Sequence, residues 1–106
     1  MADITSNQQK VLLAMLKNNL EILTTYMDES AVEIINTELT QYIQASTAFI
    51  EREGITLNLE EISDCMLVVM YSAWLYEKRK DPTAQMPRML RYNLNNRLFA
   101  EKVQEA

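Results

Sequence analysis

The stretch of sequence that decides the fold runs from Leu59 to Lys80 and reads LEEISDCMLVVMYSAWLYEKRK. Between Cys65 and Tyr76, eleven of twelve residues are apolar, and only Ser72 interrupts the run. The run is too continuous for a half-exposed strand and too short between its charged borders for a membrane-spanning helix. A helix that is apolar on every side must be covered on every side. The sequence therefore predicts a buried central helix at about residues 59–80.

Both ends of this helix carry suitable residues. Asn58 and Glu61 have the spacing of a capping box, in which each side chain accepts a bond from the other residue's backbone amide. Glu60, Glu61 and Asp64 place negative charge at the positive end of the helix dipole, and residues 78–80 place positive charge at the negative end. An Asp-Pro pair follows and ends the helix, because proline has no amide hydrogen to donate.

Length and composition indicate one small helical domain. The chain has 106 residues with one glycine and two prolines, and 106 residues suffice for a single core. The alternating pattern of half-buried strands is nearly absent. We therefore expect residues 1–106 to form an all-α bundle of about four helices. The sequence shows no signal-peptide pattern, so a cytosolic chain or an assembly of cytosolic subunits is expected.

Residues that carry catalysis or hold metal ions are scarce. Histidine, the commonest general base and metal ligand, is absent. Cys65 lies inside the apolar run, which favours a buried, unreactive thiol. Glu60, Glu61 and Asp64 resemble a metal or acid–base cluster, but helix-end electrostatics accounts for all three. We therefore expect no enzymatic activity, no cofactor and no bound metal.

A first helix is expected from Ser6, which has capping-box spacing with Gln9, to about Leu20. Its apolar residues follow the spacing of one helical face. They are Val11, Leu12, Met15, Leu16 and Leu20. Residues 21–26 contain two threonines and indicate a connection rather than a helix.

A second helix is expected to follow Asp28, the predicted N-cap, and to run to about Glu53. Gly54, the only glycine, is expected to end it in a left-handed conformation. The apolar stripe of this helix steps by three and four residues and comprises Val32, Ile35, Leu39, Tyr42, Ser46 and Phe49. Because a serine interrupts the short stripe, packing within the chain is favoured over a coiled coil.

The last helix is expected at about residues 87–103, with Pro87 at its first position. Leu90, Leu94 and Leu98 form a narrow apolar stripe, so this helix has little to bury in its own domain and is available for docking. The candidate interface residues are Met86, Arg88, Met89, Arg91, Tyr92, Asn95, Asn96 and Arg97. Truncation after Lys80 is therefore expected to leave a folded three-helix core.

Charge is distributed unevenly along the chain. The net charge is −5 overall, with −8 in residues 1–76 and +3 in residues 77–106. This asymmetry allows the chain to attract copies of itself or to offer its basic end to an acidic partner. A solvated basic helix explains it equally well. Tight DNA binding is disfavoured by the acidic chain and the small number of arginines.

Five sequence segments add a family resemblance. In order they are LKNNLEI at 16–22, DE at 28–29, YIQASTAFIEREGI at 42–55, WLYEKRKDP at 74–82 and MPRMLRYNLNNRL at 86–98. Together they resemble the phage head–tail connector family typified by the connector of phage HK97, which has prophage relatives in Gram-positive bacteria. The resemblance covers about residues 10–100 and depends mostly on segment order and on the last segment.

The resemblance implies a structural virion protein at the head–tail junction, present in the host cytoplasm before assembly and without a membrane partner. Its subunits would form a homo-oligomeric, dodecameric ring beneath the portal protein. That ring joins the portal to a tail-side head-completion or stopper protein and leaves a channel through which DNA passes as cargo. The family engages the portal with its C-terminal helical part, which corresponds to residues 87–103 here.

Two other classes of function remain open. One is a cytosolic helical adaptor or regulator that binds a partner helix through residues 87–103. The other is a weak DNA-binding subunit that uses the same helix. A shift titration with DNA at low and moderate salt separates the second class from the first.

Overall fold

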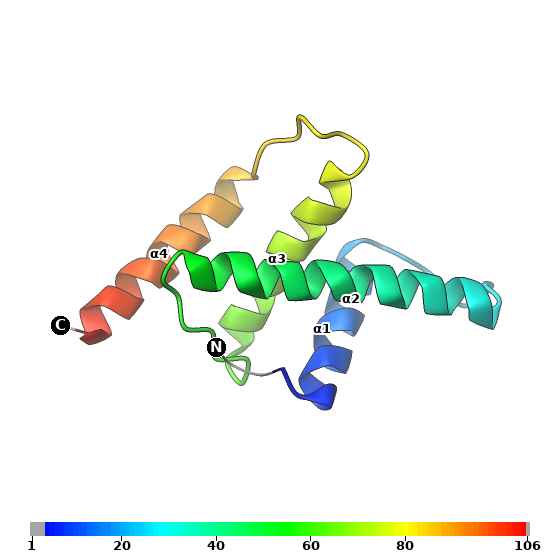
Figure 1. The fold of residues 1–106 in the computed structure, drawn as a ribbon, viewed down its shortest axis with the longest axis horizontal. Helices are drawn as coiled ribbons and strands as arrows, with labels where there is room; N and C mark the ends of the chain where they lie inside the picture. Colours follow the sequence, from blue (N-terminus) through cyan, green and yellow to red (C-terminus); the bar gives the residue numbers. More distant parts are fainter. Residues whose placement is uncertain (1–3, 106) are drawn as a thin grey trace.

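Four α-helices make up most of the chain, namely α1 (Ser6–Asn19), α2 (Glu29–Arg52), α3 (Ile62–Lys78) and α4 (Arg88–Glu105) (Figure 1). The computed structural model describes residues 4–105, and no strand occurs among them. α3 contacts each of the other three helices, and α1 also packs against α2. The predicted all-α bundle around a central apolar helix is confirmed.

The central helix is not covered on every side, contrary to the prediction. Its buried residues include Leu67, Val68 and Ser72, whereas Met66 is 52% exposed. Trp74, which lies inside the apolar run that was predicted to be buried, is only partly buried. Three neighbouring helices cover most of the circumference of α3 and leave one side of it in contact with solvent.

α1 spans Ser6–Asn19, close to the expected span, but its cap lies one residue before the predicted Ser6. Thr5 provides the cap, because its hydroxyl accepts a hydrogen bond from the Gln8 amide at 3.1 Å and its own amide donates to Gln8 Oε1 at 3.0 Å. Ser6 and Gln9 have the same spacing one position later, so spacing alone did not distinguish the two pairs. Ile4 packs against the core, which supports the earlier entry of the chain into the helix.

Both predicted ends of α2 are confirmed. The carboxylate of Asp28 accepts a hydrogen bond from the Ala31 amide at 2.8 Å, and this bond is the main cause of the lowered pKa of Asp28. Gly54 follows the helix with a φ of 104°, a conformation that costs little only for glycine. A Cβ atom at this position would also lie 3.3 Å from Leu98 of α4.

The predicted start of α3 is wrong, because the capping box at Asn58 and Glu61 does not form. Asn58 Oδ1 instead accepts a hydrogen bond from the amide of Glu60 at 3.1 Å, and its carbonyl accepts one from the amide of Glu61. Asparagine side chains often close such turns on their own backbone. The turn delays the helix to Ile62, and no side-chain hydrogen bond caps it.

α4 belongs to the core, which corrects the expectation that it has little to bury. Leu90 and Leu94 are fully buried, and Leu98 packs against the core at its edge. Pro87 precedes the helix instead of occupying its first position as predicted, and its carbonyl accepts the first helical hydrogen bond, from the Arg91 amide at 3.1 Å. A narrow stripe is sufficient for burial because α4 packs along α3 with only one side.

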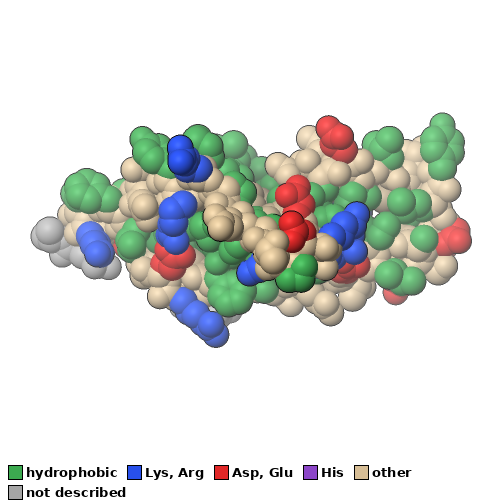
Figure 2. Space-filling model, turned by 90° about the horizontal axis from the view of Figure 1, so that it is seen from above, with side chains coloured by type: hydrophobic (Ala, Val, Ile, Leu, Met, Phe, Trp, Pro, Cys, Tyr) green, Lys and Arg blue, Asp and Glu red, His purple; other side chains and the backbone are tan. Residues whose placement is uncertain are grey.

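The molecule is elongated, with principal extents of 51 × 33 × 18 Å. The N-terminal end of α2 projects at one end of the long axis, and the C-terminal end of α4 lies at the other (Figure 1). Figure 2 shows apolar side chains at both ends, with basic side chains more frequent over the half that holds α4. No described helix is long and apolar enough to cross a membrane.

Candidate functional site

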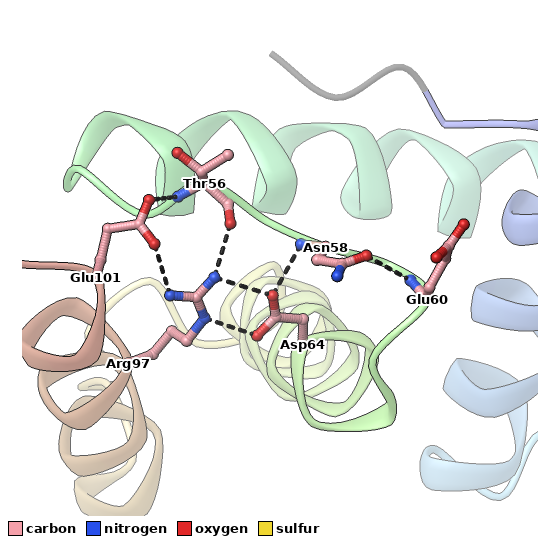
Figure 3. Close-up of polar contacts among 6 residues, drawn as sticks. All are labelled: Thr56, Asn58, Glu60, Asp64, Arg97 and Glu101. Carbon is pink, nitrogen blue, oxygen red and sulfur yellow. Dashed lines mark hydrogen bonds and ion pairs between the residues drawn. The ribbon is translucent and has the colours of Figure 1, made fainter. Parts of the chain in front are cut away.

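The inner side of α4 contains a hydrogen-bonded network of two ion pairs centred on Arg97 (Figure 3). Arg97 Nε lies 2.9 Å from Asp64 Oδ1, and Nη1 lies 2.8 Å from Glu101 Oε2. Nη2 lies 2.7 Å from the carbonyl oxygen of Thr56. These contacts raise the pKa of Arg97, with the hydrogen bonds to Asp64 as the main cause. The Asp64 side chain is only 4% exposed, so Arg97 neutralises a charge inside the domain.

The two carboxylates of this network also hold the segment that connects α2 to α3. Asp64 Oδ2 accepts a hydrogen bond from the Asn58 amide at 2.8 Å, and Glu101 Oε1 accepts one from the Thr56 amide at 3.1 Å. The bond from Arg97, followed by the bonds from Thr56, holds the pKa of Glu101 below its usual range. The network therefore ties α3, α4 and the connecting segment together. Asp64 thus has a role beyond the helix-end charge that its position predicted.

Arg91, a second arginine of the predicted interface, contacts the end of α2. Its two terminal nitrogens donate to the two carboxylate oxygens of Glu53, with Nη1 3.4 Å from Oε2. The Arg91 side chain is 43% exposed, and ion pairs at such exposure contribute little to stability. The contact nevertheless directs this guanidinium toward its own domain. Two of the three arginines predicted for docking, Arg91 and Arg97, thus have partners within the chain.

The other predicted interface residues lie in two places. Met86 precedes α4 and packs against the core. The rest lie exposed on α4 and comprise Arg88, Met89, Tyr92, Asn95 and Asn96. The structure therefore brings these five onto the exposed side of the helix, and partner binding there stays a prediction.

The exposed side of α4 carries an apolar stripe, interrupted by one asparagine, that the sequence analysis only partly identified. We define the outer stripe as Met89, Tyr92, Asn96, Phe99 and Val103. Its four apolar members are between 56% and 70% exposed. Their spacing of three, four, three and four residues is that of the contact positions of a coiled coil. Phe99 and Val103 were missed, although this spacing would have predicted them.

The outer stripe is suited to packing against another helix. Its length from residue 89 to residue 103 corresponds to about 21 Å of helix. Arg88 and Lys102 are exposed at its two ends, whereas Glu101 points into the network with Arg97. The exposed side of α4 between residues 88 and 104 therefore contains basic side chains and no carboxylate. Such a surface favours an acidic amphipathic segment.

The described residues offer few groups for chemistry. Cys65 is buried, its thiol lies 3.1 Å from the carbonyl oxygen of Leu59, and burial raises its pKa. A high thiol pKa disfavours the nucleophilic thiolate. Within residues 4–105, no group of three or more histidine, cysteine or acidic side chains is arranged to hold a metal ion. The outer stripe is therefore the strongest candidate for a functional surface.

Comparison with known proteins leaves the family open. No family model, curated protein or solved structure matches this chain. The fold and the outer stripe define the protein as a small all-α domain with one exposed apolar helix face on α4. Its resemblance to head–tail connectors depends on the five sequence segments alone.

Proposed function

We propose that the chain is a structural subunit of a phage or prophage head–tail connector. It would form a ring beneath the portal protein, link the capsid to the tail side, and leave a channel for DNA. The observation that carries this proposal is the outer stripe of α4. Four apolar side chains at coiled-coil spacing stay exposed on a helix whose opposite side is buried, and exposed patches of this kind mark interaction sites.

The attachment of α4 to the domain supports a role in assembly. Leu90 and Leu94 anchor the inner side of α4. Arg97 joins the helix to α3 and to the segment that connects α2 to α3. A rigid element loses little conformational entropy when it binds, so more of the contact free energy is retained. The outer stripe is thus held in place before any partner arrives.

The charge distribution is consistent with a ring through which DNA passes. Residues 1–76 have a net charge of −8, and an acidic surface repels phosphate and so avoids trapping the moving duplex. Arg91 and Arg97, which a DNA-binding surface would need, contact Glu53 and Asp64 instead. This arrangement favours DNA as cargo over DNA as a ligand.

Electron microscopy of the chain mixed with its cognate portal protein tests the proposal. We expect an additional ring of density on one end of the portal, and co-sedimentation of the two proteins. A chain that neither co-sediments with the portal nor adds density to it would contradict the proposal. The portal alone, imaged in the same buffer, is the control.

The outer stripe also favours a second function, that of an adaptor which binds a helix of a cellular partner. Helix-in-groove recognition uses apolar anchors at the same three- and four-residue spacing. The two functions differ in their partners and in stoichiometry. An adaptor is expected to bind one partner helix per chain and to give no ring on the portal.

A further inference from the structure

We infer that the outer stripe of one copy receives the α2 arm of a second copy, so that copies of this chain join head to tail. The α2 arm is defined as residues 23–38, which comprise most of the α1–α2 connection and the first part of α2. This inference rests on the proposed function, since it takes the partner to be another subunit. It assigns the outer stripe to the neighbouring subunit rather than to the portal.

The α2 arm is a second exposed apolar surface. Leu23 is 77% exposed, Tyr26 98% and Ile34 67%. Figure 1 shows that this part of α2 extends beyond the bundle. The domain therefore leaves apolar side chains uncovered at both ends of its long axis, and a single copy cannot bring the two ends together.

Charge complementarity selects the pairing. The α2 arm contains four acidic residues and no basic residue. Of these, Asp28, Glu29 and Glu33 are exposed, and Glu38 lies 3.6 Å from Arg79. The outer stripe is flanked by Arg88 and Lys102. Pairing two outer stripes or two arms would bring like charges together, whereas pairing arm with stripe brings opposite charges together.

The shape of the arm suits the outer stripe. A shallow hollow on α2 is lined by residues that include Ile34, Thr37 and the two acidic residues Glu33 and Glu38. In the proposed contact an apolar side chain such as Phe99 would occupy this hollow, and its basic neighbour Lys102 would approach Glu33 and Glu38. Asn96 occupies the middle of the stripe, where a polar residue in an apolar seam specifies register.

A contact between two different surfaces is heterologous. Repetition of such a contact closes into a ring when the rotation between copies permits it, and otherwise extends into a filament. The arm and the stripe lie at opposite ends of a 51 Å molecule (Figure 1). Head-to-tail joining therefore places each copy between two neighbours, as a ring requires.

Sedimentation velocity across a concentration series up to about 1 mM tests the inference, because even a Kd of about 1 mM leaves a large associated fraction there. We expect the wild-type chain to associate, and to associate less as the salt concentration rises. Ile34→Asp in the arm and Phe99→Asp in the stripe should each abolish association. Val11→Asp is the matched control, because Val11 is a 53% exposed apolar residue on α1, and it should associate like wild type.

Mixing the two interface variants separates head-to-tail joining from a symmetric dimer. The Ile34→Asp variant retains an intact stripe, and the Phe99→Asp variant retains an intact arm. A mixture should therefore form one intact contact and stop at a one-to-one dimer. If Ile34→Asp associates like wild type while Phe99→Asp does not, the stripes pair with each other and the inference is wrong.

Two further outcomes would overturn the inference, namely a wild-type chain that stays monomeric at about 1 mM, or Val11→Asp acting like the interface variants. Circular dichroism of each variant verifies that the fold is retained.

The proposed function can fail independently of this inference. Head-to-tail association of the wild-type chain without any ring on the portal would contradict the connector proposal and leave the inference standing. If both interface variants still form rings on the portal, the inference is wrong and the connector proposal stands.

Discussion

The two sides of α4 differ in burial in a way that residue type does not suggest. The inner side carries an arginine and a glutamate, Arg97 and Glu101, yet it is packed against the domain. The outer side carries methionine, tyrosine, phenylalanine and valine, yet these side chains are more than half exposed. Charged groups can be buried when each has a partner. An exposed apolar side, in contrast, indicates a surface that another molecule covers.

The largest effect is expected from removing the inner side altogether by truncation after Lys80. The deletion uncovers the surface that Leu90 and Leu94 cover and leaves Asp64 without Arg97. We expect loss of cooperative unfolding, measured by thermal melting followed with circular dichroism. This reverses the expectation from sequence of a stable three-helix core. A truncated chain that melts like the intact one would show that α4 is dispensable for folding.

Arg97→Met is expected to have the next largest effect, because it leaves the buried Asp64 carboxylate without its counter-charge. Breaking a buried pair from one side costs about 3–5 kcal/mol. Chemical denaturation measures the loss. Arg88→Met, at an exposed arginine on the same helix, is the matched control and should stay within about 0.5 kcal/mol of wild type. Equal losses in the two variants would contradict a special role for the inner ion pair.

Leu94→Ala should destabilise the domain by about 2–5 kcal/mol, because it leaves a cavity at a fully buried position. Phe99→Ala, five residues along the same helix but on its outer side, should cost far less in the monomer. Chemical denaturation at low protein concentration compares the two variants. A larger loss for Phe99→Ala would mean that the outer stripe is covered within the domain.

The smallest effect concerns pH and Glu101, whose folded-state pKa lies below its usual range because of Arg97 and Thr56. A carboxylate with a depressed folded pKa stabilises the fold above its unfolded pKa and loses that contribution as the pH falls through the folded value. The loss should therefore begin below about pH 4.3. Glu101→Gln should flatten this part of the curve of unfolding free energy against pH, measured by chemical denaturation between about pH 6 and about pH 3. An unchanged slope would contradict the assignment.

Features encoded by near neighbours were predicted well. The Asp28 cap, the Gly54 terminus and the bounds of α2 are all as predicted, because each depends on residues within one helical turn. The predicted cap of α1 and the predicted start of α3 were wrong for a related reason. At α1, two residue pairs have the spacing of a capping box. At α3, the Asn58 side chain can accept a hydrogen bond either from an amide in the first turn of a helix or from an amide of a local turn.

The candidate site was predicted in part. Arg88, Met89, Tyr92, Asn95 and Asn96 are exposed as an interface requires. Arg97 contacts Glu101, four residues further on, a pairing that helical spacing allows. Arg91 and Arg97 also contact Glu53 and Asp64, which lie 38 and 33 residues away. No local pattern specifies contacts at that separation. The spacing of Phe99 and Val103 could have placed them on the same stripe, but the sequence could not have shown that this stripe is exposed.

The sequence by itself determined that this chain forms helices, roughly where they lie, and that the apolar run within α3 is central. Helical hydrogen bonds, caps and apolar periodicity involve residues a few positions apart, so the order of residues is sufficient to specify them. Only the tertiary structure decided which side of α4 is buried. That choice depends on the fit of Leu90 and Leu94 against α3 and on the meeting of Arg97 with Asp64. Both require the chain to fold back on itself, so the exposure of the outer stripe follows from packing and not from composition.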